Sequence, residues 1–310
     1  MKDKPLITIA IPTYNRADSY LKKSLQCAIS QTYKNIEIIV SDNCSTDNTE
    51  ELVNSYKDFR IQYFKQSVNM GALKNKDFCL EKTNGVYHLL LMDDDMIDND
   101  FIEACMQAAD YSTNFGIIRT GARVINSNDE IIYETPNKVK GFSTEEFFRG
   151  WFAGKTSWYP CNTLFNTKGL KKIGGFRSKL NLVDDGMAII RLAHMYGRAD
   201  VEDVKASFRV HPAQITFAAN VMDWCDDYLY LLDKMCDIVN DNGKLRTEGM
   251  RFFCILNYKR TRAINSNLRR FITYLKVYRK FKYVYSPIFY LGLPYFKRAK
   301  NKLRFIINDF

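Results

Sequence analysis

The chain has 310 residues, of which 46% are hydrophobic, so it is long enough to bury a sizeable core as one large domain or two small ones. No run of 18 apolar residues is present and the N-terminus lacks the pattern of a secretory signal, so we expect neither an ordinary membrane-spanning helix nor a leader. Eight scattered cysteines without a C-x-x-C pair, and only three histidines, argue against a zinc site and favour reduced thiols.

The net charge of +10 hides a division along the chain. Residues 1–242 hold 28 Lys and Arg against 33 Asp and Glu, whereas residues 243–310 hold 17 against 2. A mildly acidic body is therefore followed by a strongly basic tail, and the two parts need separate explanations.

The first 125 residues alternate strand-like and helix-like segments. Apolar, β-branched runs predict strands at 6–12, 36–42, 61–66, 86–92 and 116–125, the last entering a hairpin. Helical spacing and capping residues predict helices at 17–31, 45–56, 71–83 and 99–110. Buried strands separated by helices predict an α/β fold with a mostly parallel sheet.

The pattern after residue 125 is less regular. A capping box begins a predicted helix at 143–152, paired glycines turn the segment 170–176, and two acids begin a predicted helix at 182–197. A last strand is expected at 204–212, and the chain from 222 onward has a helical pattern. We therefore expect one α/β domain over 1–215 and a basic helical region over 216–310.

Polar side chains follow three of the predicted strands. They belong to the segment 13–16, to Asp42 and Asn43, and to the acids Asp93, Asp94 and Asp95. Because ligands bind outside the carboxyl ends of parallel strands, these groups should share one cleft. Two neighbouring carboxylates repel by roughly 1 kcal/mol in water and about 4 at an effective dielectric of 20. A Mg²⁺ or Mn²⁺ ion would relieve that repulsion, and a solvated acidic loop is the alternative.

Four sequence blocks resemble glycosyltransferase family 2, the nucleotide-sugar transferases of GT-A fold. The segments "ITIAIPTYNR" and "SLQCAISQTYKNIEIIVSDNCSTDNT" look like its opening, and "GVYHLLLMDDDM" resembles its strand ending in D-x-D. "IGGF", followed by "DDGMAIIRL", resembles its G-G-F and E-D blocks. The resemblance implies a GT-A-like, Rossmann-related sheet in which 1–125 binds the nucleotide and 126–215 the acceptor.

For the nucleotide, the resemblance implies contacts at the first two strand ends. Pro12, Thr13 and Arg16 would lie beside the nucleotide. Asp42 would bind the edge of the base, typically uracil, although a turn-stabilising acid is the plain structural explanation of this residue.

For the metal, the resemblance points to the acid triplet. Asp93 and Asp95 match the ends of D-x-D, which holds Mn²⁺ or Mg²⁺ and, through it, the diphosphate and ribose. Asp94 fills the middle position and would contact the ribose as part of the donor site. His211 resembles a late histidine that contacts metal or diphosphate in some members, and a packed strand-end histidine is its alternative.

For catalysis, the resemblance points to the start of the helix expected at 182–197. Asp185 matches the second acid of the E-D pair, the base of inverting members. Asp184 stands where Glu is usual, which leaves Asp184 as the alternative base. An acid favoured by the helix dipole would also explain Asp185. Trp151 and Trp158 suit a sugar face and a packed core equally well, so we assign them no role.

The predicted function is an inverting, metal-dependent hexosyltransferase reaction. It would move a sugar from a nucleotide-diphosphate donor, expected to be UDP-linked, to a hydroxyl of a growing, lipid-linked bacterial surface glycan such as a capsule or O-antigen. A dTDP-deoxysugar donor is one alternative, because uracil and thymine present the same hydrogen-bonding edge. A non-catalytic sugar-nucleotide-binding or assembly scaffold is another.

The basic tail predicts where the protein works. Residues 267–306 interleave aromatic and cationic side chains without an acid, which favours attachment to an anionic membrane surface at the inner face of the cell membrane. Docking on a partner, or self-packing, is the alternative. Nucleic-acid binding is not expected, since no recognised nucleic-acid motif accompanies the charge.

Overall fold

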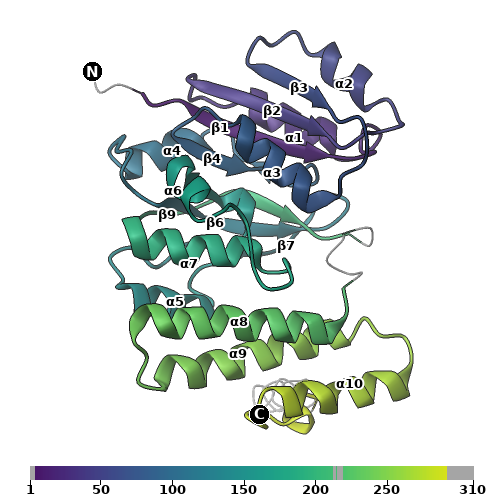
Figure 1. The fold of residues 1–310 in the computed structure, drawn as a ribbon, viewed down its shortest axis with the longest axis vertical. Coiled ribbons are helices and arrows are strands. Elements are labelled where there is room, and N and C mark those ends of the chain that lie inside the picture. Colours follow the sequence, from purple (N-terminus) through teal and green to yellow (C-terminus); the bar gives the residue numbers. More distant parts are fainter. Residues whose placement is uncertain (1–3, 212–213, 215–218, 292–310) are drawn as a thin grey trace, which may run out of the picture. The chain divides into compact units, whose positions relative to one another are not determined.

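Residues 4–211, 214 and 219–291 are described by the computed structural model, in which the chain divides into two units (Figure 1). The first unit spans 1–217 and holds the strands of the described chain, while the second spans 218–310 and is helical where it is described.

Nine strands of the described chain form one sheet, in the order β3-β2-β1-β4-β8-β6-β9-β5, with β7 paired to β6. The parallel half consists of β1 (Ile7–Thr13), β2 (Ile36–Asp42), β3 (Ile61–Lys65) and β4 (Tyr87–Leu90). In the other half, β6 (Ile117–Ile125) and β9 (Arg198–Arg209) are parallel, and antiparallel partners are supplied by β5 (Met96–Ile97), β7 (Ile131–Thr135) and β8 (Thr163–Asn166). The predicted α/β fold is confirmed.

Helices cover both faces of this sheet (Figure 1). α1 (Leu21–Ile29) packs on β1 and β5, α4 (Phe101–Ala108) on β6 and β9, α2 (Thr49–Ser55) on β2 and β3, α3 (Ala72–Lys82) on β1 and β2, and α7 (Asp184–Tyr196) on β6 and β8. Along β1, Ile9 packs in the cluster that holds Leu25 and Phe101, while the next residue, Ala10, packs with Cys79. The strand is therefore apolar on both faces, as its sequence predicts.

The ends of several elements follow from local chemistry. Ser143 and Glu146 form the predicted capping box at the start of α5 (Thr144–Phe152). Gly174 and Gly175, at φ +83° and +78°, follow α6 (Thr167–Lys172) in a conformation that favours glycine. Gly197, at φ +72°, ends α7, and β9 begins at the next residue rather than at 204, because the chain pairs with β6 at once.

The second unit is a bundle of α8 (Val221–Val239), α9 (Lys244–Thr261) and α10 (Asn267–Lys280), in which α8 and α9 pack together and α10 contacts both (Figure 1). Tyr228 stacks between Trp224 and Phe253, and the guanidinium of Arg260 lies 3.5 Å from the Trp224 ring centroid. The described part of the predicted region 216–310, residues 219–291, contains these three helices. Residues 216–218 and 292–310, which include the end of the predicted basic tail, lie outside the described residues. In the part of the chain that is described, no helix has the length and apolarity needed to cross a membrane.

Candidate active site

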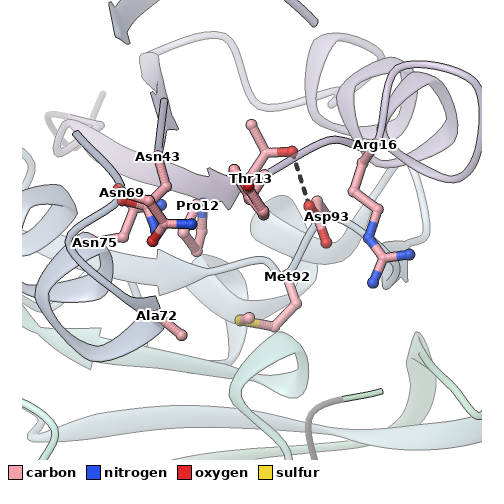
Figure 2. Close-up of a pocket in the computed structure, with 10 residues that line it drawn as sticks. Pro12, Thr13, Arg16, Asn43, Asn69, Ala72, Asn75, Met92 and Asp93 are labelled. Carbon is pink, nitrogen blue, oxygen red and sulfur yellow. Dashed lines mark hydrogen bonds between the residues drawn. The ribbon is translucent and has the colours of Figure 1, made fainter. Parts of the chain in front are cut away.

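A cavity of about 250 Å³ opens at the carboxyl ends of β1, β2 and β4, beside the N-terminus of α3 (Figure 2). Its lining residues are Pro12, Thr13, Tyr14, Arg16, Asn43, Asn69, Ala72, Asn75, Met92 and Asp93. Three amide side chains gather at one side of the cavity, and Asp93 and Arg16 lie at the other. This is the edge at which parallel sheets bind ligands.

Asp93 brings a carboxylate to the charged side of the cavity. Thr13 Oγ1 donates a hydrogen bond of 2.8 Å to Asp93 Oδ2 (Figure 2). Burial and the negative charge of Asp94 raise the pKa of Asp93 to about 7, while the bond from Thr13 and the charge of Arg16 oppose that rise. Additional positive charge at this site would therefore favour the ionised form of Asp93.

Asp94 points instead to the segment that follows β9. Its Oδ2 lies 2.9 Å from His211 Nε2, so a carboxylate oxygen and an imidazole nitrogen meet at one place. Among the residues that the structure describes, no group of three or more His, Cys, Asp or Glu side chains is arranged to hold a metal ion. The pair nevertheless fits a cation that completes its coordination with substrate phosphates, as Mg²⁺ commonly does.

Asp95 turns away from the cavity into the protein interior. Its side chain is completely buried, and Oδ1 accepts a hydrogen bond of 2.9 Å from the backbone N–H of Arg209. The backbone oxygen of Asp95 accepts another from Ser24 Oγ at 2.7 Å. Burial and the charge of Asp94 raise the pKa of Asp95 well above its ordinary value. These contacts tie the turn to α1 and β9, while Asp95 Oδ2 is buried without a hydrogen-bond partner in the described part of the chain. The predicted role of Asp95 as a metal ligand therefore stays a prediction.

Asp42, at the end of β2, is also completely buried. Its Oδ1 accepts from the Ser45 backbone N–H at 2.8 Å, and its Oδ2 accepts from the Tyr63 hydroxyl at 2.6 Å. The next residue, Asn43, lines the cavity and donates through Nδ2 to Asn69 Oδ1 at 2.9 Å. Asn43 is one of the strand-end residues that the sequence predicts for this cleft. Asn69 was not predicted, because it lies in the loop between β3 and α3 and does not directly follow a strand.

The start of α7 places Asp184 and Asp185 next to each other. Asp184 forms a salt bridge with Lys76 of α3, the residue after the cavity-lining Asn75. Asp185 remains partly exposed, and its Oδ1 accepts from the Gly186 backbone N–H at 2.8 Å. Burial and the charge of Asp184 raise the pKa of Asp185 to about 6, although the charge of Lys76 opposes them. A carboxylate in that range suits a general base near neutral pH.

The two tryptophans without an assigned role form a stack. The rings of Trp151 and Trp158 lie 4.1 Å apart between centroids at an interplanar angle of 12°. Trp158 is buried and also contacts Phe147 and Phe148. This arrangement favours core packing for Trp158 over contact with a sugar.

Comparisons with known proteins find sequence relatives among bacterial transferases. An uncharacterized glycosyltransferase of Haemophilus influenzae is 40% identical over 101 residues, which are 32% of this chain and 40% of that protein. Another, of Rickettsia typhi, is 30% identical over 220 residues, 69% of this chain and 67% of that protein. A UDP-Glc:α-D-GlcNAc-diphosphoundecaprenol β-1,3-glucosyltransferase of Escherichia coli is 40% identical over 90 residues, 29% of this chain and 36% of that enzyme.

Solved structures share the fold at low sequence identity. TarS of Staphylococcus aureus, residues 1–349 in complex with UDP-GlcNAc, aligns with a TM-score of 0.60 and 15% identity over 90% of this chain and 89% of that one. The mannosyltransferase PcManGT of Pyrobaculum calidifontis, in complex with GDP-Man and Mn²⁺, aligns with a TM-score of 0.58 and 16% identity over 91% and 86%. These alignments support the GT-A architecture.

The family model that matches the chain begins at Thr8 in β1 and ends at Gly174, the first glycine of the pair after α6. It is described as glycosyl transferase family 2 and matches residues 8–174, more than half of the sequence. The resemblance found in the sequence is therefore confirmed, and the chain belongs to glycosyl transferase family 2.

Proposed function

We propose that the chain is an inverting, metal-dependent transferase that moves a sugar from a nucleotide-diphosphate donor to an acceptor hydroxyl. The observation that carries the proposal is the strand-end cavity, which is lined by Thr13, Arg16 and Asp93. The residue after Asp93, Asp94, pairs with His211. A polar cavity with a neutral side and a charged side suits a ligand that has a neutral base and a charged diphosphate.

The donor would bind with its base at the asparagine side of the cavity. An amide both donates and accepts hydrogen bonds, and the uracil edge offers one N–H and two carbonyl oxygens. Asn43 and Asn69 line the cavity, whereas Asp42 is completely buried, so the two asparagines are better placed to meet this edge. UDP is the favoured nucleotide, since TarS is solved with UDP-GlcNAc, and dTDP presents the same edge.

The cation would be held by Asp94 and His211, together with the donor diphosphate. Mn²⁺ or Mg²⁺ there would supply electrostatic stabilisation of the negative charge that develops on the leaving nucleotide. The solved complex of PcManGT contains Mn²⁺. Asp93, one residue away and bonded to Thr13, would contact the ribose or share the cation. This assignment moves the principal metal ligand from Asp95 to Asp94.

Asp185 is proposed as the general base. It would accept the proton of the acceptor hydroxyl while that oxygen forms a bond to the anomeric carbon of the sugar. The bond from this carbon to the diphosphate oxygen breaks on the opposite face, so the configuration inverts and no covalent enzyme intermediate forms. Asp184 is less suited to this role, because its carboxylate is held by Lys76.

The acceptor would be a lipid-linked oligosaccharide of a bacterial surface glycan, capsule or O-antigen being the expected types. The name of the similar Escherichia coli enzyme specifies an undecaprenol-diphosphate acceptor, which supports this proposal. An acceptor of that kind lies at the membrane, so the protein would work as a peripheral protein at its cytoplasmic face.

A panel of nucleotide sugars with Mn²⁺ tests the proposal. The purified chain should release free UDP from one donor, Asp185→Asn should bind that donor without releasing UDP, and NMR of a glycoside product should show an inverted anomeric centre. Tight donor binding without turnover in the unaltered chain, across all donors and acceptors, would favour the scaffold alternative.

A further inference from the structure

Helix α10 carries apolar side chains on two faces. Tyr274 and Val277 are buried within the second unit. On the other face, four large apolar side chains are exposed: Leu268 (69%), Phe271 (56%), Ile272 (42%) and Leu275 (45%). Their spacing of three, four and seven places them in one row along the helix, here called the α10 stripe. Such a row exposed to water is unfavourable unless something covers it.

Positive charge surrounds the α10 stripe. The helix itself holds five cations and no acid, the cations being Arg269, Arg270, Lys276, Arg279 and Lys280. No Asp or Glu occurs anywhere between residues 249 and 308. The surface that covers the stripe must therefore be apolar in its interior and negatively charged at its margin.

Exposed apolar side chains and cations are also found after the end of α10. Ile288 and Phe289 are 78% and 71% exposed. A cavity of about 350 Å³ in this unit is lined by the cations Arg246, Lys280 and Lys282, by one acid, Asp233, and by Leu229, Thr247, Met250 and Val284. Arg246 is paired with Asp233 and Lys280 with Asp226, so Lys282 is the lining cation for which the structure describes no ion pair. This cation beside apolar side chains suits the head group of an anionic amphiphile.

We propose that α10 lies in the plane of an anionic phospholipid bilayer, with the α10 stripe inserted at the level of the upper acyl chains and its cations on the lipid phosphates. Basic helices with one exposed apolar row bind membranes in this way. A second copy of the chain is a poorer occupant, because pairing two stripes would bring two sets of five cations together without an acid on either helix. Membrane binding by α10 is argued from the structure alone. The idea that it brings the enzyme to a lipid-linked acceptor rests on the proposed function.

The full chain tests the surface in co-sedimentation with vesicles. Vesicles of phosphatidylcholine with 30% phosphatidylglycerol should sediment the protein, whereas pure phosphatidylcholine vesicles should not, and binding should weaken as salt is added. Phe271→Ser combined with Leu275→Ser should lower the partition coefficient at least tenfold. Phe59→Ser is the matched control, since Phe59 is 97% exposed in the first unit and should leave partitioning unchanged.

Three further readouts decide the outcome. Far-UV circular dichroism should show that the Phe271→Ser, Leu275→Ser variant is folded, as expected for exposed positions. A second variant, Arg269→Gln with Lys276→Gln, should bind the anionic vesicles more weakly, and its binding should depend less on salt. Equal partitioning of both variants and the unaltered chain would overturn the proposal. A dimer of the unaltered chain that the double variant dissociates in sedimentation velocity would also overturn it. Donor hydrolysis without vesicles should be the same in all these variants, and its absence would count against the proposed function alone.

Discussion

The ends of β2 and β4 place their acids in the same way but present different chemistry to the cavity. At each end one acid is completely buried. Both oxygens of Asp42 accept hydrogen bonds, whereas Asp95 accepts one from the Arg209 N–H through Oδ1 only. A nearby residue at each end faces the cavity. At the end of β2 this residue is the neutral Asn43, and after β4 it is the acid Asp93. Polar residues that follow one another at a strand end therefore have different surroundings: one is buried in the protein interior, and another lines the cavity.

The largest effect is expected from Asp185→Asn, which tests the proposed general base at the start of α7. Loss of a general base should lower kcat by about 10²–10⁴-fold. The affinity for UDP with Mn²⁺ should stay the same, because the residue does not line the donor cavity. Steady-state kinetics and isothermal titration calorimetry measure the two quantities. Retained turnover would move the base to Asp184, for which Asp184→Asn is the control.

Asp42→Ala and Asn43→Ala test whether the two residues at the end of β2 have different roles, one in stability and the other in UDP binding. Asp42→Ala leaves the Ser45 N–H and the Tyr63 hydroxyl without an acceptor, which should cost about 1–3 kcal/mol of unfolding free energy in urea titrations. It should leave UDP affinity largely intact in the folded protein. Asn43→Ala should instead weaken UDP binding more than stability. The opposite pattern would return the base contact to Asp42, as the sequence predicted.

The pH dependence of transfer tests the pairing of Asp184 with Asp185. Only the ionised form of Asp185 can act as base, so with a pKa of about 6 the rate should rise roughly tenfold between pH 5 and pH 7. Asp184→Asn removes the neighbouring negative charge that raises this pKa, and Lys76 continues to lower it. The rise should therefore move to lower pH in that variant. An unmoved profile would mean that another group controls the rate.

Thr13→Val should have the smallest effect. It removes the hydrogen bond to Asp93 Oδ2, which favours the ionised carboxylate, so the pKa of Asp93 should rise further above about 7. Carbon-13 NMR of the labelled carboxyl group measures the titration, and Thr13→Ser should leave it close to the original value. A fall in the pKa of Asp93 in Thr13→Val would show that the hydroxyl does not stabilise the charge.

The parallel half of the sheet was predictable because its signal is local. Apolar runs and helical spacing marked β1 to β4 and their helices within a few residues of the observed ends. β5 and β8 were not predicted, because segments of two and four residues are too short to show the alternation of apolar and polar residues that marks a strand. Their strand character depends on pairing with β9, β4 and β6, which are distant in sequence.

The sequence also located the site edge but not the orientation of each acid. The three adjacent aspartates cannot be told apart from the residues around them in the sequence. Their side chains point in different directions because the backbone turns after β4. The contact that buries Asp95 comes from Arg209, 114 residues later, and the group that meets Asp94 comes from His211, 117 residues later. Contacts of that range are set by the assembled sheet, so no periodicity in the sequence reports them.

Calorimetric titration of UDP with and without Mn²⁺ into two variants tests the division of the acid triplet most directly. Asp95→Asn keeps an acceptor for the Arg209 N–H, so it should retain the gain in UDP affinity that Mn²⁺ provides. Asp94→Ala removes the partner of His211 and should lose that gain. If Asp95→Asn loses the Mn²⁺-dependent gain while Asp94→Ala keeps it, the proposed cation site is contradicted.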